Sequence, residues 1–285
     1  MPIELEHVTH TYMTGTPQAV PALCDLCMHI EDGEMVGIIG HTGCGKSTMI
    51  QLVAGLISPT GGRILLDGQD INAKDYNRSV LRGSVGIVFQ YPEYQLFERT
   101  VEKDVAFGLK HSGLSRDEVA ARVRWALEIM DFDFESVRTQ SPMALSGGEK
   151  RRVAIAGVLA ARTKILIFDE PIAGLDPIGR DAFLKLITRL NQDGTTIIMI
   201  SHNSDAIAEY TRRIAVLDNG RLVADDTPKR VFSDIALIEK LELGVSTPRE
   251  IAAGLAKRGV YIPEDTVIYG ELLSALKLKL GGDSA

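Results

Sequence analysis

The chain has 285 residues, of which 45% are hydrophobic and 24% charged, and its formal net charge is −7. This composition is typical of a globular protein with a sizeable core, and the acidic balance lacks the basic field that nucleic acid binding needs, so we expect no nucleic acid partner. The longest apolar runs, Ile165–Phe168 and Ile197–Ile200, are far shorter than the roughly 20 residues of a membrane-spanning helix.

Residues 1–35 alternate short β-like runs with turns, including Ile3–Val8 and Leu23–Ile30. This pattern predicts an antiparallel sheet. The acidic start of the segment does not match an export signal, so we expect the chain to stay in the cytoplasm. Cys24 and Cys27 form a C-x-x-C pair in the second run. A strand without a second Cys or His pair nearby favours neither metal nor redox chemistry there.

From Met35 the pattern changes to apolar strands that alternate with helices. The expected strands are Val36–Ile39, Val85–Phe89, Ile165–Phe168, Thr195–Ile200 and Ile214–Leu217. This alternation is typical of a buried parallel sheet covered by helices. The fold class is therefore predicted to be α/β.

A glycine-rich segment follows the first of these strands and precedes a helix that starts near Lys46. It matches the pattern G-x-x-x-x-G-K-[ST] and consists of Gly40, His41, Thr42, Gly43, Cys44, Gly45, Lys46, Ser47 and Thr48. Its glycines let backbone N–H groups and the helix dipole face phosphates, while Lys46 reaches the β and γ oxygens and Ser47 takes Mg²⁺. We therefore predict that the segment binds ATP and Mg²⁺, with Cys44 as a small filler.

The sequence between Pro92 and Ser146 is mainly helical in pattern. Ser115 and Glu118 have the spacing of a capping box, which predicts that a helix begins here and continues through Met130. We expect this segment to be a helical subdomain inserted into the α/β fold.

The apolar run that ends at Phe168 is followed by two acidic residues, Asp169 and Glu170. Because ligands bind at the carboxyl ends of strands in open α/β sheets, we expect Asp169 to hold Mg²⁺. Glu170 would then lie beside the γ-phosphate, where it can orient and polarise the attacking water. Two such acids could instead begin a solvated loop, but the upstream phosphate loop favours the catalytic interpretation.

Short amphipathic segments follow Asp226, and the clearest are Thr247–Arg258 and Tyr269–Leu280. One face of the second segment carries Leu272, Leu276 and Leu280. We predict that residues 227–285 form a separate helical extension that helps two subunits to associate. The alternative is that these leucines cover only their own domain.

The segment Leu145–Glu149, of sequence LSGGE, precedes a helix expected from about Lys150 to Ala161. It resembles the signature motif of ABC-family ATPases. The resemblance implies a P-loop NTPase with a RecA-like parallel-sheet core, an antiparallel β subdomain and a helical subdomain at about 92–150, all within residues 1–226. It also implies that the γ-phosphate of ATP held by a second subunit is bound by Ser146, Gly147 and Gly148. The family often has Gln at the position of Glu149.

Further matches to this family extend over about residues 3–225. The resemblance implies that Gln90 contacts Mg²⁺ or water and senses the transport partner, that Asp176 reaches across the dimer, and that His202 touches the γ-phosphate. Tyr12 resembles the aromatic residue that stacks on adenine, although it could instead pack on the leading sheet. The Mg²⁺ ligands implied are Ser47, Gln90 and Asp169.

The segments Phe89–Phe97, Thr100–Gly108, Pro228–Ser233 and Ile262–Asp265 resemble the energy-coupling factor ATPases more closely than those of ordinary importers. In that family two ATPases lie at the cytoplasmic face beneath a transmembrane coupling protein and a substrate-binding membrane protein, and they import vitamins or transition-metal ions. An ATPase of a conventional importer or exporter, a non-transport ABC protein and a cassette that only binds nucleotide are the alternatives.

The segment that follows Gln90 carries several apolar residues beside this nucleotide sensor. We expect them to form the wall of a groove that receives a helix of the coupling protein, with core packing as the alternative. The residues are Tyr94, Leu96, Phe97, Val101, Val105 and Phe107.

Overall fold

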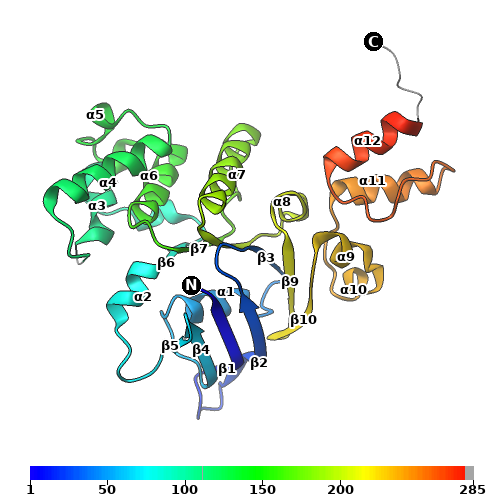
Figure 1. Cartoon of the computed structure of the whole chain (residues 1–285), viewed down its shortest axis with the longest axis horizontal. Helices are drawn as coiled ribbons and strands as arrows, with labels where there is room; N and C mark the ends of the chain where they lie inside the picture. The colour runs from blue at the N-terminus through cyan, green and yellow to red at the C-terminus, as the bar shows by residue number, and fades with distance from the viewer. Residues whose placement is uncertain (111, 280–285) are drawn as a thin grey trace.

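The computed structural model of the chain describes residues 1–110 and 112–279. The N-terminal part forms a four-stranded sheet with the order β2-β1-β4-β5 (Figure 1). All of its neighbouring strands are antiparallel, as predicted. The strands are β1 (Ile3–Tyr12), β2 (Val20–Ile30), β4 (Gly61–Leu66) and β5 (Gln69–Asp70).

A second sheet of six strands has the order β10-β9-β3-β8-β7-β6. The five strands from β9 to β6 are parallel, which confirms the predicted α/β core, and β10 pairs antiparallel with β9 at one edge. The sequence reasoning missed β10. The strands are β3 (Met35–Ile39), β6 (Val85–Val88), β7 (Ile165–Asp169), β8 (Thr196–Ile200), β9 (Arg213–Asp218) and β10 (Arg221–Asp226).

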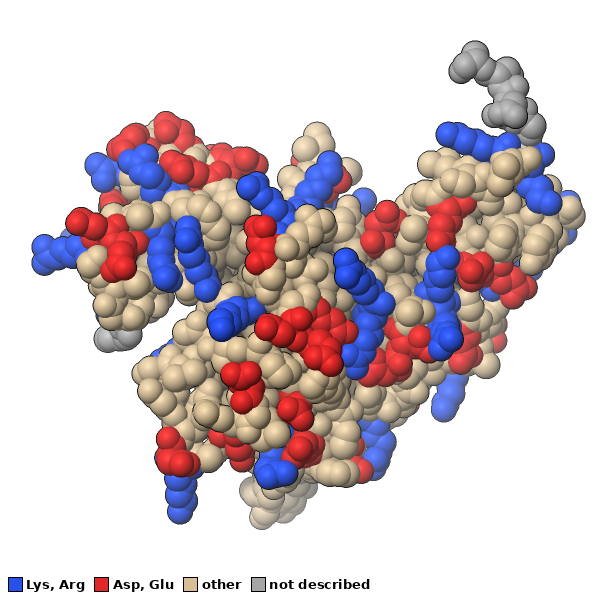
Figure 2. Space-filling view, in the orientation of Figure 1, with Lys and Arg blue, Asp and Glu red and all other residues tan. Residues whose placement is uncertain are grey.

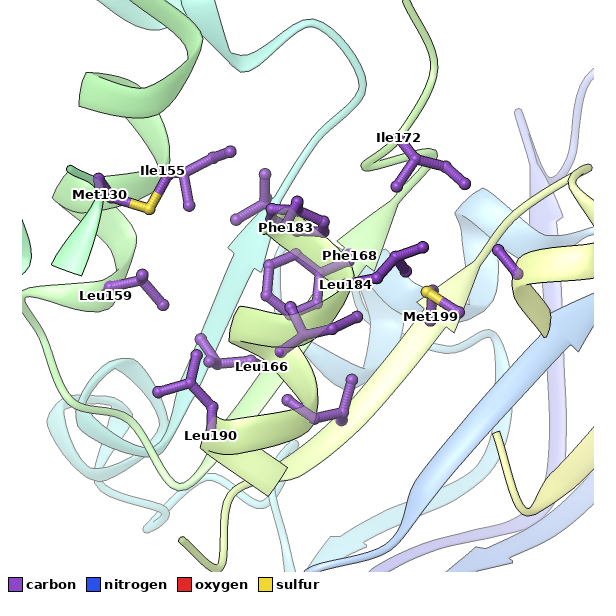
Figure 3. Close-up of a cluster of buried hydrophobic side chains, with 14 of the residues drawn as sticks. Met130, Ile155, Leu159, Leu166, Phe168, Ile172, Phe183, Leu184, Leu190 and Met199 are labelled. Atoms are coloured by element: carbon purple, nitrogen blue, oxygen red, sulfur yellow. The ribbon is translucent and has the colours of Figure 1, made fainter. Parts of the chain in front are cut away.

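The core lies on both faces of the six-stranded sheet because successive side chains of a strand point to opposite faces. On β8, Ile197 and Met199 join one cluster, and Ile198 and Ile200 join the other. The first cluster lies under the helices, where the rings of Phe168 on β7 and Phe183 on α7 (Pro177–Gln192) meet edge to face at 5.4 Å (Figure 3). The second cluster lies against the four-stranded sheet and α1 (Lys46–Val53).

The predicted helical insertion is confirmed between β6 and β7. The capping box is present at α4, where the Ser115 hydroxyl accepts from the Glu118 N–H and the Glu118 carboxylate accepts from the Ser115 N–H. The signature helix α6 begins at Gly147, earlier than expected, because Ser146 and Glu149 form a second capping box. The elements of the insertion are η1 (Pro92–Gln95), α3 (Val101–Ala106), η2 (Phe107–Leu109), α4 (Arg116–Ile129), α5 (Phe134–Val137), η3 (Pro142–Ala144) and α6 (Gly147–Leu159), whereas α2 (Arg78–Ser84) precedes β6.

The C-terminal part is less separate than the sequence suggested. Its helices are α9 (Pro228–Ser233), α10 (Ile235–Lys240), α11 (Thr247–Ala256) and α12 (Tyr269–Lys279). The expected boundary at 226 falls inside the main hydrophobic core, because that core also includes Val231, Phe232, Ile238 and Leu241.

A small second core holds α11 and α12 together. It contains Ala252, Ile262 and Leu272, and Leu276 packs against it. Leu272 and Leu276 therefore pack within the extension itself, over the residues that the structure describes, and the association of two subunits through this extension stays a prediction. Leu280, the third leucine of that face, lies outside the described residues.

The surface carries charges of both signs. On the face drawn in Figure 2, basic and acidic side chains are interspersed over the core and the C-terminal helices. In the described ranges, 1–110 and 112–279, every helix is too short or too polar to traverse a bilayer.

Phe232 provides a test of whether the start of the extension belongs to the core. Its side chain is fully buried in the main cluster. We expect Phe232→Ala to lower the free energy of unfolding by about 3–5 kcal/mol, the usual cost of such a truncation. Urea unfolding measures this change. The control Leu278→Ala, at a position 86% exposed, should change it by less than about 0.5 kcal/mol. Equal effects of the two variants would contradict the assignment of α9 to the core.

Candidate functional site

A cavity of about 530 Å³ lies at the carboxyl ends of the central parallel strands. It combines residues from the antiparallel sheet, the phosphate loop and the ends of β6, β7 and β8. The lining residues predicted from the sequence are Tyr12, Thr42, Gly43, Gly45, Lys46, Ser47, Thr48, Gln90, Asp169, Glu170 and His202. Segments far apart in the chain therefore meet at one site.

The phosphate loop joins β3 to α1 as predicted. Gly40 and Gly45 pack closely against other backbone segments, since a Cβ atom at Gly40 would lie 2.3 Å from the Leu217 carbonyl oxygen and one at Gly45 would lie 2.6 Å from that of Ala22. Gly45 is also the N-cap of α1 and offers no side-chain hydrogen bond. The first N–H groups of α1 are therefore available to an anion.

Three loop residues do not line the cavity. His41 turns to β9, where its Nε2 lies 3.0 Å from Asp218 Oδ1. Cys44 is fully buried beneath the loop, which agrees with the predicted filler role. Gly40 lies against β9. Of the predicted binding residues in the loop, these three can offer only their backbone to a ligand.

Lys46 is buried, and its side chain extends across the phosphate loop to the residues at the start of the loop. Its Nζ donates to the carbonyl oxygens of Gly40 at 2.6 Å and His41 at 2.9 Å. An ammonium group held at this place lies close to the first turn of α1. Together they form a positively polarised surface for phosphate.

Tyr12 lies at the end of β1 and borders the cavity. Its hydroxyl lies 3.1 Å from Thr48 Oγ1, and its ring meets that of His10 edge to face at 4.6 Å. Val20 and Pro21 of β2 line the same part of the cavity. A partly exposed aromatic ring between apolar neighbours is suited to stacking on a base.

Asp169 ends β7 beside the phosphate loop. Burial raises the pKa of its carboxyl, and the positive charge of Lys46, then His202 and the Ser47 hydroxyl oppose this shift. Carboxylate, hydroxyl and amide oxygens are thus available from Asp169, Ser47 and Gln90, which all line the cavity. Such oxygen donors suit Mg²⁺.

Glu170 is held in a strained conformation at the same edge. Its φ angle is 51°, a region that residues other than glycine rarely adopt, and its N–H donates to the Ile200 carbonyl at 2.9 Å. Its carboxylate accepts from the Ser201 hydroxyl at 3.4 Å and lies 3.6 Å from His202 Nε2. Burial raises the pKa of Glu170, which suits a group that takes up a proton.

The signature residues lie away from this cavity. Ser146, Gly148 and Asp176 line a second cavity of about 260 Å³ between α6 and α7, and Gly147 is the first residue of α6. Glu149 is part of this site, where hydrogen bonds from the Ser146 hydroxyl and N–H lower the pKa of its carboxyl.

Arg151 connects two parts of this region, and the sequence analysis did not single it out. It is buried, and its guanidinium donates to the carbonyl oxygens of Ala173 at 2.7 Å, Pro171 at 2.6 Å and Glu170 at 3.3 Å. It thereby ties the signature helix to the segment that connects Glu170 with Asp176.

The prediction that the apolar residues after Gln90 form the exposed wall of a groove is only partly correct. Leu96, Val101 and Val105 are core residues, because the short helices here turn them into the main cluster. The exposed members are Tyr94, Phe97 and Phe107, with Tyr91 beside them. The rings of Phe97 and Phe107 meet edge to face at 4.7 Å. We call these four exposed side chains the aromatic patch.

Comparison with known proteins agrees with this geometry. A family model described as ABC transporter matches residues 23–173. The chain is 44% identical over 277 residues to "Energy-coupling factor transporter ATP-binding protein EcfA2" of Clostridium perfringens (strain 13 / Type A), covering 97% of each chain. The chain belongs to the energy-coupling factor ATPases of the ABC transporter family. A protein of the same name from Caldanaerobacter subterraneus subsp. tengcongensis is 48% identical over 272 residues, 95% of each chain.

Solved structures of ABC ATPases have the same fold. The structure of cbiO1 from Clostridium perfringens, described as part of the ABC transporter complex cbiONQ, has a TM-score of 0.72 and 38% identity and covers 90% of this chain and 98% of its own. The ATP-binding cassette MJ0796, as a dimer bound to ADP and Pi, has a TM-score of 0.70 and 29% identity and covers 79% and 98%. The expected P-loop NTPase fold and the family of this energy-coupling factor ATPase are thus confirmed.

Arg151 offers a test of how the signature helix supports the catalytic segment. We expect Arg151→Lys to lower the free energy of unfolding by about 1.5–3 kcal/mol and to reduce ATP turnover, because a lysine cannot span three carbonyl groups. Thermal unfolding and phosphate release measure the two effects. Arg152→Lys is the matched control on the next residue, where the side chain stacks on Phe132 at 4.8 Å. An Arg151→Lys variant as stable and active as this control would contradict the role.

Proposed function

We propose that this energy-coupling factor ATPase binds ATP with Mg²⁺ in the cavity of about 530 Å³ and hydrolyses it to drive an importer. The proposal rests on one observation: the phosphate loop, Asp169 and Glu170 lie around one cavity at the same edge of the sheet. A phosphate-binding surface, an oxygen-donor set and a half-buried carboxylate are the parts that hydrolysis of a phosphoanhydride requires.

Each group has a distinct role in this proposal. Lys46 and the N–H groups of the loop bind the β and γ phosphates, and Tyr12 stacks on adenine. Ser47, Asp169 and Gln90 would hold Mg²⁺, which neutralises charge on the phosphate oxygens when bound.

Glu170 acts as the base for the attacking water. Its carboxylate accepts a proton as the water oxygen bonds to the γ-phosphorus and ADP leaves, and its raised pKa favours this uptake. The backbone strain at Glu170 aims the carboxylate at the cavity, and His202 on the other side steadies it and binds the γ-phosphate.

The two separate cavities support a site shared between two subunits. Lys46 lines one cavity and Ser146 the other, so the signature residues of one chain are free to serve ATP held by another. We infer that Ser146, Gly147, Gly148 and Asp176 complete the site of a second ABC ATPase subunit, identical or related. The N-terminus of α6 then supplies N–H groups to the γ-phosphate.

The aromatic patch is the surface that we propose for the membrane partner. It follows Gln90 directly, so a change at the γ-phosphate can reach it through a short segment. Four partly exposed rings favour an amphipathic helix of a transmembrane coupling protein as the partner. The ATPase would then lie peripherally at the cytoplasmic face of the membrane, beneath that coupling protein and a substrate-binding membrane protein that selects the cargo.

The variant Glu170→Gln tests the catalytic assignment. We expect ATP binding to persist and turnover to fall by about 10²–10⁴, the usual range for losing a general base. Nucleotide affinity and phosphate release are measured with the second ATPase subunit carrying the corresponding substitution. The control Glu209→Gln removes an exposed carboxylate from α8 (Ser204–Tyr210) and should leave turnover unchanged. Undiminished hydrolysis by Glu170→Gln would refute the role of this residue as the base.

Replacing Tyr94 and Phe97 together with Asp tests the docking surface. Charge at a desolvated interface is costly, so we expect either loss of assembly with the membrane partner or ATP hydrolysis without uptake. The affinity for ATP should stay within about 3-fold of that of the unaltered protein. Co-purification and uptake in vesicles report these effects. Leu56→Asp introduces the same charge at an exposed apolar residue outside the patch and serves as control. Normal assembly and uptake by the double variant would place the docking surface elsewhere.

A further inference from the structure

The pairing of β1 with β2 shifts register at three successive places, and the first two of them form the feature described below. The register shifts between Leu5 and Val8 and again between Val8 and His10. His7 and Asp25 lie at these shifts and have φ angles of 52° and 58°. Irregular positions of this kind redirect side chains away from the regular alternation of a strand.

A neighbouring strand accommodates this distortion. Gly62 on β4 has a φ of 79°, and a Cβ atom there would lie 2.3 Å from the His7 carbonyl oxygen. A glycine is therefore needed opposite His7. The irregular backbone at His7 is thus supported from both sides of β1.

The two irregularities bring three donor side chains to one point. His7 Nδ1 lies 2.8 Å from Asp25 Oδ1 and 3.6 Å from Cys27 Sγ, and the donor atoms of all three residues lie within 4.8 Å of one another. The His7 N–H also donates to Cys27 Sγ at 3.3 Å, which holds the sulfur toward β1.

The arrangement differs from a proton relay. In a relay, a carboxylate and a nucleophile bind the two different nitrogens of an imidazole. Here Asp25 and Cys27 both approach Nδ1 of His7. Donors that converge from three side chains on a common point suit a central cation better than a chain of proton transfers.

The spacing of Cys24 and Cys27 does not by itself indicate a metal site, but the fold adds donors from β1 and β2 to Cys27, and we propose that His7, Asp25 and Cys27 bind a zinc ion, with water as the fourth ligand. Zn–S and Zn–N bonds of about 2.3 and 2.0–2.1 Å place sulfur and nitrogen about 3.6 Å apart across a tetrahedral ion, which matches the observed separation of Cys27 Sγ and His7 Nδ1. The Asp25 oxygen must move outward by about 0.6 Å to reach a tetrahedral position, and its side chain is exposed and free to rotate.

The chemistry of the donors favours zinc over Mg²⁺. Mg²⁺ prefers oxygen ligands, whereas a thiolate with an imidazole and a carboxylate suits Zn²⁺. The three residues are exposed, so an ion can enter from solvent. None of them lines the ATP cavity, so the zinc site is distinct from the site for Mg²⁺.

A bound ion would cross-link β1 and β2, the first two strands in Figure 1. Tyr12 at the end of β1 and Val20 at the start of β2 both line the ATP cavity. The ion would therefore stabilise the strand pair that carries the base-facing side of the nucleotide site, without contact with the phosphates.

Titration of the tag-free full-length protein with Co²⁺, followed by displacement with Zn²⁺, tests the site. We expect thiolate-to-cobalt charge-transfer absorption with a stoichiometry of one ion per chain, lost on addition of Zn²⁺. Cys27→Ser and His7→Asn should each weaken Zn²⁺ binding by more than about 100-fold, since even residues that only support a ligand contribute about 10–100-fold. Asn tolerates the left-handed conformation of His7, and retained ATP binding shows that the variants fold.

Cys24→Ser is the matched control on the same strand. Cys24 is not part of the cluster, so its replacement should leave the charge-transfer band and the Zn²⁺ affinity unchanged. Absence of the band in the unaltered protein would overturn the proposal. A band that persists in Cys27→Ser would do so as well, because it would come from another thiol, such as the buried Cys44.

Discussion

The close packing of the phosphate loop between two sheets is the constraint on which the rest of the site depends. Gly40 packs against β9 and Gly45 against β2. The turn residue Gly220 adds two hydrogen bonds of 2.9 Å. Its N–H donates to the Cys44 carbonyl, and its carbonyl accepts from the Cys24 N–H. These contacts fix the antiparallel sheet against the parallel one. The ring of Tyr12 and the carboxylate of Asp169 therefore keep their places around one cavity.

A second set of contacts fixes the opposite end of the site. Arg151 joins the signature helix to the carbonyl groups that follow Glu170, and the Glu170 N–H continues the ladder of β8. The conformation of the proposed base thus depends on the helical insertion as well as on the sheet. A movement of the helical part, such as one caused by a partner at the aromatic patch, would act directly on the residues around Glu170.

Much of this site could be predicted because its residues lie in short contiguous motifs. The phosphate loop, the acids after β7 and the capping box at Ser115 are each local patterns with one structural meaning. Leu96 could not be separated from its exposed neighbours, since a short irregular helix gives no periodicity. The local pattern places Phe232 in a separate tail, because no local pattern shows the contacts distant in sequence that bury it in the main core. Arg151 and the His7 cluster depend on such contacts too.

The placement of Lys46 and Ser146 in different cavities affects how the rate of ATP hydrolysis depends on the concentration of the subunit. If each site needs both residues and they come from different chains, hydrolysis is second order in free subunit. Dilution would then lower the rate of hydrolysis per subunit even without an inhibitor. A membrane partner that holds two subunits side by side replaces bulk concentration with a much higher local one, and thereby confines ATP consumption to assembled transporters.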